Sequence, residues 1–297
     1  SPPRSTKTIL GTVCCFLVLI LLESWSTYLV YRSSKSTSPR ILFLTKQYTK
    51  VPEPSDLLTQ GVLPNKMRYT ILPRVLEPSD YEQGPPYLNA DTSTKTPPPP
   101  SIITGTFSLA MHIEVGSLDE EEEERGLAHF VEHLCFDASN KFNKRYGIWQ
   151  QLDLLGVRAN AFTTTRSTVY EHFDVMNDSV TTKGVFEIAR EQLLYTIPTQ
   201  VNIDIEKGAV LGEQRMRNNT ESIVDDRELC SFFGLKSTIC QRLPIGVIQT
   251  VEKFNINRVQ TFLNKWYHPE RTHLLIAGDV QVSQIVPLLQ DIFGRAQ

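Results

Sequence analysis

The sequence predicts an α+β domain in which helices cover a mostly antiparallel β-sheet. Residues 105–117 alternate between apolar and polar side chains, which is typical of a half-buried strand. Residues 180–195 instead carry apolar side chains at helical spacing. Strand-like and helix-like segments follow in the order β, β, α, α, β, β, α, α, α, β, α. Such runs favour an α+β domain over a strictly alternating α/β domain.

Each predicted element has a local signal. The other strands are rich in β-branched and aromatic residues or are continuously apolar, and they lie in 62–73 (after a turn), 158–175 (a pair) and 272–280. The acidic run 119–124 suits the positive end of a helix that reaches about residue 137. The remaining helices are expected at 143–155, which ends at Gly156, and at 180–195, 203–219, 256–266 and 283–293.

The composition is that of an ordinary globular protein. The 297 residues are 40% hydrophobic and 21% charged, enough for one large domain or two small ones. A net charge of −3 creates no strong field toward an anionic partner. Basic residues are scattered and do not gather with aromatic residues, so nucleic acid is not expected as a partner.

The amino-terminal segment is expected to lie outside the folded domain. Residues 9–22 carry no charge and follow Arg4 and Lys7, which is typical of a signal peptide. A membrane anchor over residues 9–31 is the alternative. Either one favours the secretory pathway, with the chain secreted or anchored in a membrane. The predicted divisions are a signal peptide or anchor at 1–31, a linker at 32–56, and a folded domain at 57–297 with a Pro-rich insertion at 74–101.

Three cysteines lie within the predicted domain. Cys230 and Cys240 are close enough in sequence to form a local disulfide if the domain enters an oxidising compartment. Two buried free thiols are an equally good interpretation. Cys135 has no CxxC partner, so we interpret it as a small buried residue.

The stretch RGLAHFVEHLCFD, residues 125–137, carries the chemistry. His129 and His133 are four residues apart, so on a helix they share a face and can present imidazole nitrogens to one cation. Glu132 reaches the same space and can act as a general base. A catalytic zinc site needs three protein ligands and an open position. Two buried helix histidines are the alternative interpretation.

A third ligand has to come from another segment. The predicted helix IDIEKGAVLGEQR carries Glu206 and Glu213 seven residues apart, and therefore on one face. Either carboxylate alone would be interpreted as solvated helix surface. As a same-face pair among apolar residues, they are better candidates for a metal site.

These stretches together resemble a known family. GLAHFVEHL, RANAFTTTRSTVY, EKGAVLGEQR, RLPIG and KWYHPERTHLLIAGDV occur in the order and spacing of the pitrilysin/insulinase family of zinc metallopeptidases, the inverted zincins. The resemblance covers about residues 57–297 and implies a single pitrilysin-type half-domain. The His-x-x-Glu-His motif followed by a glutamate some eighty residues later is the specific part of it.

The resemblance implies a role for each candidate residue. One zinc ion per domain would be bound by His129, His133 and Glu213. Glu132 would be the general base that activates a zinc-bound water. Glu206 would hold a histidine ligand in orientation. Asn160 and Ala161 would hydrogen-bond a substrate backbone that adds as a strand to the sheet edge. Without the resemblance, these two residues would be interpreted as a plain strand.

The implied activity is that of an endopeptidase acting on peptides or unfolded polypeptides. Family proteases close a chamber from two halves, so a second half-domain is expected in cis or in trans. Two departures from the family pattern are Lys207, where the family has Arg, and the insertion 74–101. An alternative function is a non-catalytic structural or binding half. A further alternative is a membrane-tethered adaptor in which the proline run 97–100 is a polyproline ligand.

Overall fold

The computed structural model describes residues 58–73, 105–142 and 146–294. The predicted signal peptide or anchor at 1–31, the linker at 32–56 and the insertion at 74–101 lie outside the described residues. The boundaries of these divisions therefore stay predictions. Among the helices that are described, none combines the length and the apolar character needed to cross a membrane.

Six strands of the described chain form one sheet in the order β1-β2-β6-β3-β5-β4. Their bounds are β1 Thr59–Val62, β2 Arg68–Pro73, β3 Thr106–Ile113, β4 Arg158–Thr163, β5 Thr168–Met176 and β6 Thr272–Gly278. All neighbours pair antiparallel except β2 and β6, which pair parallel. The predicted α+β class with a mostly antiparallel sheet is confirmed, and the sheet is mixed because β6 inserts between β2 and β3.

The helices of the described chain follow the predicted order with additions. Their bounds are α1 Leu127–Asp137, α2 Gly147–Leu155, α3 Ser179–Leu194, α4 Gln200–Arg217, α5 Thr220–Phe233, α6 Thr238–Gln241, α7 Ile248–Val251, α8 Ile256–Trp266 and α9 Val282–Ile292. The sequence analysis missed α5 to α7 and the short strand β1. Cys230 is the one buried residue of α5, so that helix has no continuous apolar stripe to detect.

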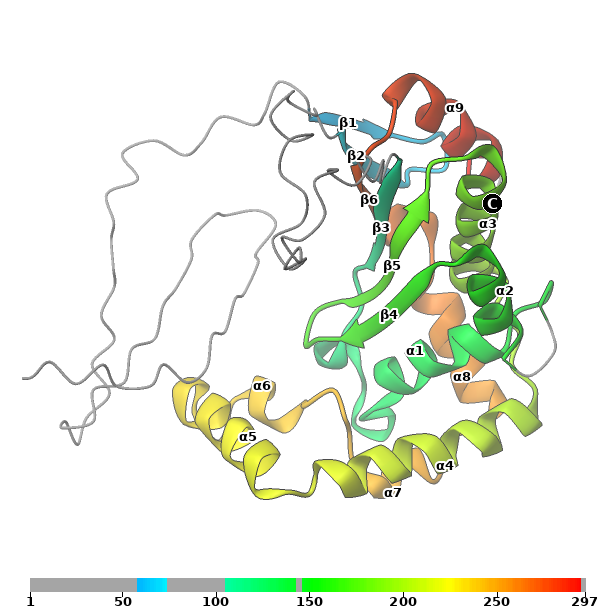
Figure 1. Cartoon of the computed structure of the whole chain (residues 1–297). Coiled ribbons are helices and arrows are strands. Elements are labelled where there is room, and N and C mark those ends of the chain that lie inside the picture. The colour runs from blue at the N-terminus through cyan, green and yellow to red at the C-terminus, as the bar shows by residue number, and fades with distance from the viewer. Residues whose placement is uncertain (1–57, 74–104, 143–145, 295–297) are drawn as a thin grey trace, which may run out of the picture. The chain divides into compact units, whose positions relative to one another are not determined.

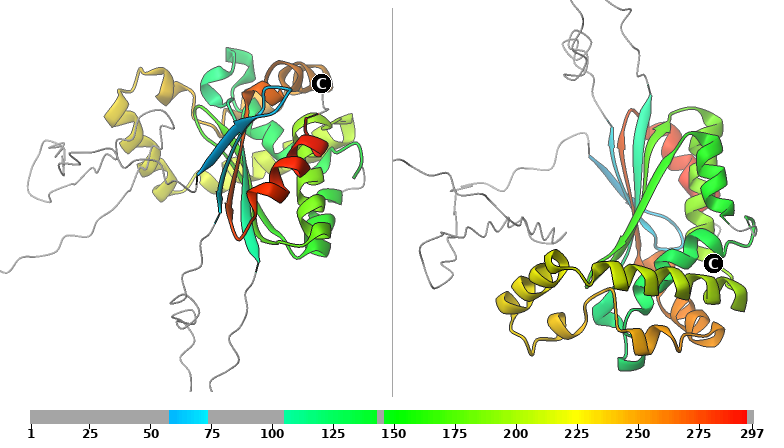
Figure 2. Two further views of the ribbon diagram at one scale, coloured as in Figure 1. Left: turned by 90° about the horizontal axis from the view of Figure 1, so that it is seen from above. Right: turned by 60° about the horizontal axis from the view of Figure 1, so that its bottom comes forward.

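Helices α1, α2, α3 and α9 lie on one face of the sheet (Figures 1 and 2). The alternation predicted for 105–117 is seen in β3, where every second residue is buried toward this face. These residues are Phe107, Leu109, Met111 and Ile113. The core between the sheet and these helices thereby fixes the position of α1, the helix that carries His129 and His133.

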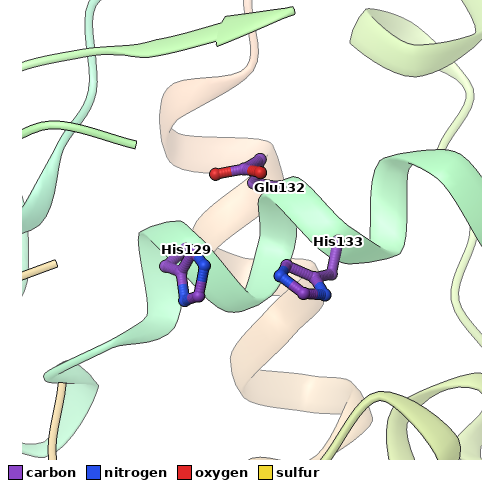
Figure 3. A group of neighbouring side chains, drawn as sticks. All are labelled: His129, Glu132 and His133. Atoms are coloured by element: carbon purple, nitrogen blue, oxygen red, sulfur yellow. The ribbon is translucent and has the colours of Figure 1, made fainter. Parts of the chain in front are cut away.

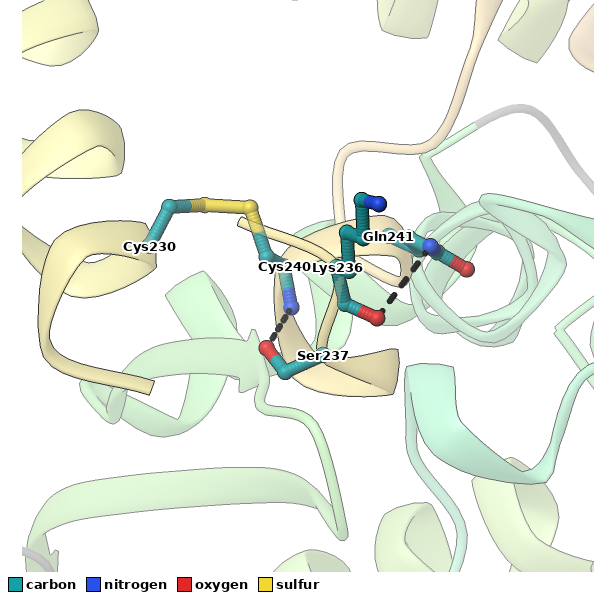
Figure 4. The surroundings of a disulfide bond; sticks show 5 residues. All are labelled: Cys230, Lys236, Ser237, Cys240 and Gln241. Atoms are coloured by element: carbon teal, nitrogen blue, oxygen red, sulfur yellow. Dashed lines mark hydrogen bonds between the residues drawn. A yellow bond between two sulfur atoms is a disulfide. The ribbon is translucent and has the colours of Figure 1, made fainter. Parts of the chain in front are cut away.

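A disulfide joins α5 to α6. Cys230 and Cys240 are bonded, and the backbone N–H of Cys240 donates to Ser237 Oγ at 3.2 Å (Figure 4). This selects the disulfide over the two free thiols that the sequence left equally possible. Cys135 is a fully buried free thiol, as predicted.

Candidate metal centre

Helix α1 places its ligands by burying the rest of its surface. Nine of its eleven residues are buried, among them Phe130, Val131 and Leu134 in the core. This packing leaves no freedom for the helix to rotate about its axis, because rotation would expose several of these apolar side chains. His129 and His133 are therefore held on one side, partly accessible from outside the core.

The two histidines and Glu132 converge as the i, i+4 spacing predicts. The imidazole centroids of His129 and His133 lie 4.8 Å apart with an 81° angle between the rings (Figure 3). One donor atom from each of these three residues lies within 4.8 Å of the other two. The structure thus brings the predicted trio together at one point above α1.

Glu213 reaches this point from α4. Its Oε2 lies 3.4 Å from His129 Nε2 and 3.6 Å from His133 Nε2. Zinc–ligand bonds of roughly 2.0–2.1 Å place two ligand atoms of a tetrahedral site about 3.4 Å apart. Both distances from Glu213 Oε2 are compatible with a shared tetrahedral zinc ion, which makes Glu213 a candidate third ligand.

Glu206 lies beside the other imidazole nitrogen of His133. Its side chain is buried, and its Oε2 is 3.3 Å from His133 Nδ1. A carboxylate on Nδ1 favours the tautomer that leaves Nε2 free for a metal. In the described part of the chain, the buried Nδ1 of His129 has no such partner. The two candidate ligands are therefore oriented differently, His133 by a carboxylate and His129 by packing.

Glu132 is buried beside the histidines and is held by strand β4. Thr163 Oγ1 donates a hydrogen bond to Glu132 Oε2 at 2.7 Å. Burial raises the pKa of Glu132, and the Thr163 hydrogen bond lowers it. Because one oxygen of Glu132 is engaged by Thr163 while Glu213 faces both imidazoles, the geometry suits Glu213 as ligand and Glu132 as base. The sequence analysis missed Thr163, although it follows Asn160 and Ala161 in the same strand.

The two histidines differ in charge. Burial, together with the neighbouring charge of His133, lowers the pKa of His129 to about 4, so this imidazole is neutral. Burial also disfavours the charged form of His133, but the hydrogen bonds that its ring donates to Glu206 and Glu213 outweigh burial and raise its pKa to about 10. A metal ion binding here has to displace the proton of His133.

A cavity of about 500 Å³ opens beside this cluster. Its lining includes Glu132, His133 and Glu206, together with Asn160 and Ala161 of β4. Three aromatic side chains also line it: Phe136, Tyr146 and Trp149. Among the strands of the described chain, β4 pairs only with β5 and so lies at an edge of the sheet. The predicted substrate residues thus sit next to the candidate metal ligands.

Comparison with known proteins shows the family of this chain. The sequence profile of insulinase, peptidase family M16, matches residues 103–227, which contain every candidate ligand. The profile of the peptidase M16 inactive domain matches residues 253–297. The chain belongs to the insulinase family. The resemblance stated from the sequence is thereby confirmed.

Relatives of this insulinase-family chain are zinc proteases and processing peptidases. The chloroplastic stromal processing peptidase of Arabidopsis thaliana is 29% identical over 80% of the chain, and the match spans 16% of that relative. The zinc protease PQQL-like of the same plant is 31% identical over 63% of the chain, spanning 20% of the relative. The probable zinc protease PqqL of Haemophilus influenzae is 30% identical over 61% of the chain and spans 20% of that protein.

Solved structures show the same fold. The periplasmic protease PqqL from Escherichia coli superposes with a TM-score of 0.69 at 22% identity, covering 83% of this chain and 24% of PqqL. The first half of PqqL gives a TM-score of 0.67 at 22% identity, covering 81% of this chain and 46% of that half. The chain therefore spans about a quarter or less of each full-length relative named above, and its fold matches part of the first half of PqqL.

Proposed function

We propose that this chain is the metal-bearing half-domain of a zinc-dependent endopeptidase. The observation that carries the proposal is the position of Glu213 Oε2, at 3.4 and 3.6 Å from the Nε2 atoms of His129 and His133. Zinc, when bound there, supplies Lewis-acid chemistry that makes water a nucleophile near neutral pH and polarises a peptide carbonyl. The roles of the individual residues below are part of this proposal.

The side chains around the zinc site would divide the remaining work. Glu132 takes a proton from the attacking water and delivers it to the leaving amine, which requires its ionised form at the start. Thr163 orients this carboxylate by donating to one of its oxygens. Glu206 keeps the Nδ1–H of His133 directed toward itself.

The substrate would lie along β4 as an added strand, beside Asn160 and Ala161. An edge strand offers unpaired backbone groups to an extended peptide. The aromatic lining of the cavity suits an apolar side chain next to the scissile bond; Phe136 and Trp149 stack with their centroids 4.4 Å apart. We expect peptides with an apolar residue there to be cleaved in preference to those with an acidic one, because Asp137 and Glu206 also line the cavity.

Metal analysis of the purified chain tests the assignment. We expect about one zinc per chain, and Glu213→Ala removes it. Glu132→Gln retains the zinc but, assayed with a second half-domain present, loses peptide cleavage by about 10²- to 10⁴-fold, the usual contribution of a positioned acid–base group. A chain that stays free of metal in zinc-containing buffer, or a Glu213→Ala variant that keeps its zinc, contradicts the ligand set.

A non-catalytic binding half is the second candidate. It is favoured by the match of residues 253–297 to the inactive-domain profile. The complete set of candidate ligands argues for the peptidase instead. Zinc binding without cleavage of any unfolded polypeptide, even when a second half-domain is supplied, would establish the binding half.

We also propose that the domain folds in an oxidising compartment, in keeping with the predicted secretory pathway. The Cys230–Cys240 disulfide supports this, because disulfides persist mainly outside reducing cytosol. Whether a membrane anchor is involved depends on residues 1–31. Thiol counting tests this on protein that is isolated without a reductant and then denatured. We expect two fewer free thiols before reduction than after it.

A further inference from the structure

The start of helix α1 lacks a capping side chain of its own. Gly126 occupies the N-cap position with φ +96°, and its position contributes no side-chain hydrogen bond. The first backbone N–H groups of any helix have no partner within the helix and need acceptors from elsewhere. At the helix that carries His129, the identity of that acceptor affects the geometry of the metal centre.

Glu120 is the acceptor. Its two carboxylate oxygens accept hydrogen bonds from the backbone N–H of Gly126 at 3.0 Å and of Ala128 at 2.8 Å. The side chain comes from six residues before Gly126 and is only 5% exposed. Both oxygens are used on adjacent points of one helical turn, which fixes the direction in which the helix leaves Gly126.

The segment that contains Gly246 also packs against this turn. A side chain at Gly246 would collide with the backbone of Gly126, so the two backbones touch directly. The carbonyl of Ile245 accepts from Gln214 Nε2 at 2.7 Å, and Gln214 follows Glu213. The first turn of α1 is therefore held between Glu120 and a segment that also contacts α4.

The position of Ala128 links these contacts to the metal centre. Ala128 immediately precedes His129, so its N–H and the backbone that carries the imidazole belong to the same turn. His129 has no carboxylate on its Nδ1 within the described residues, unlike His133. The orientation of His129 therefore depends more on the backbone than the orientation of His133 does.

We propose that Glu120 is a positioning residue for the metal centre: it fixes the first turn of α1 so that His129 Nε2 faces Glu213. The inference rests on the proposed zinc site. Burial raises the pKa of Glu120 to about 8. The hydrogen bonds that it accepts from two backbone N–H groups lower this pKa, but by less than burial raises it. Burying a carboxyl group costs stability, which is consistent with a role for Glu120 beyond capping the helix.

The experiment compares Glu120→Gln with Glu191→Gln. Glu191 is a matched control, since it is 4% exposed and its carboxylate also accepts two hydrogen bonds, from Ser139 Oγ and from the N–H of Lys141, each at 2.9 Å. Zinc affinity is measured by chelator competition on the folded full chain, and the free energy of unfolding is measured separately without metal. The zinc readout is independent of peptidase activity.

We expect Glu120→Gln to weaken zinc binding about 10-fold, and Glu120→Ala up to about 100-fold, the range typical of partners that orient metal ligands. Glu191→Gln lowers stability but leaves zinc affinity within about 2-fold of wild type. Equal zinc affinity in wild type and Glu120→Gln, or an equal loss in Glu120→Gln and Glu191→Gln, overturns the positioning role. A wild-type chain that does not bind zinc overturns the proposed function instead, so the two failures are distinguishable.

Discussion

Helices α1 and α4 contribute to the same candidate site from opposite kinds of environment. In α1, nine of eleven residues are buried, whereas in α4 the buried residues are three of eighteen: Ile203, Glu206 and Val210. The candidate ligands on α1 are held by the core on which this helix packs, while Glu213 is half-buried on a helix that buries few of its residues. We infer from this difference that α1 sets the geometry of the candidate site and that α4 adds Glu213 by packing against α1.

The largest expected effect comes from removing ligands on either helix. His133→Ala on α1 and Glu213→Ala on α4 should each lower zinc affinity by more than about 100-fold, because loss of a ligand exceeds the loss of an orienting partner. Chelator competition measures both. Asp204→Ala, on the exposed side of α4, is the control and should bind zinc normally. If α4 contributed nothing to the site, Glu213→Ala would match this control.

The same substitution on the two helices should differ in its cost to stability. Leu134→Ala empties a fully buried position in α1, which typically costs about 2–5 kcal/mol. Leu211→Ala in α4 removes a partly buried side chain and should cost less than half as much. Urea unfolding of metal-free protein compares them. Equal costs would show that α4 is anchored as firmly as α1.

A smaller effect is expected from the carboxylate that orients His133. Glu206→Gln keeps the shape of the side chain but weakens the interaction with His133 Nδ1, so zinc affinity should fall by about 10- to 100-fold. The matched change Asp204→Asn lies two residues earlier on α4 and should have no effect. Metal titration of the two variants measures this difference in zinc affinity. Unchanged affinity in Glu206→Gln would leave Glu206 with a purely structural role in α4.

The smallest effect should appear in the pH dependence of cleavage. Thr163→Val removes a hydrogen bond that favours the ionised form of Glu132, so the pKa of Glu132 should rise. Because the base must be ionised, activity should then be lost at a higher pH on the acidic side of the profile. The pH profile of kcat/KM, measured with a second half-domain, tests this against Thr165→Val. An acidic limb that does not move would exclude Glu132 as the titrating base.

The sequence was sufficient to predict much of α1 and of the sheet. Helical spacing puts His129 and His133 on one face, and alternation in 105–117 identifies the buried face of β3. Both patterns are local, since they depend only on the repeat of the backbone. For the same reason, the sequence places Glu206 and Glu213 on one side of a helix without any knowledge of the helix that packs against it.

Contacts between distant segments were decided by the tertiary structure alone. The parallel pairing of β6 with β2 joins segments that no local repeat relates. The sequence grouped Glu213 with the two histidines only through the family resemblance, and it left the state of Cys230 and Cys240 open. The structure gives the distances from Glu213 to the imidazoles and forms the disulfide. Thr163 and Glu120 escaped the sequence analysis because a threonine in a strand and a glutamate in an acidic run are ordinary residues there. Packing against α1 gives Thr163 its partner Glu132 and gives the buried Glu120 the backbone N–H groups of Gly126 and Ala128. A buried polar group such as Glu120 has to find its hydrogen bonds within the protein.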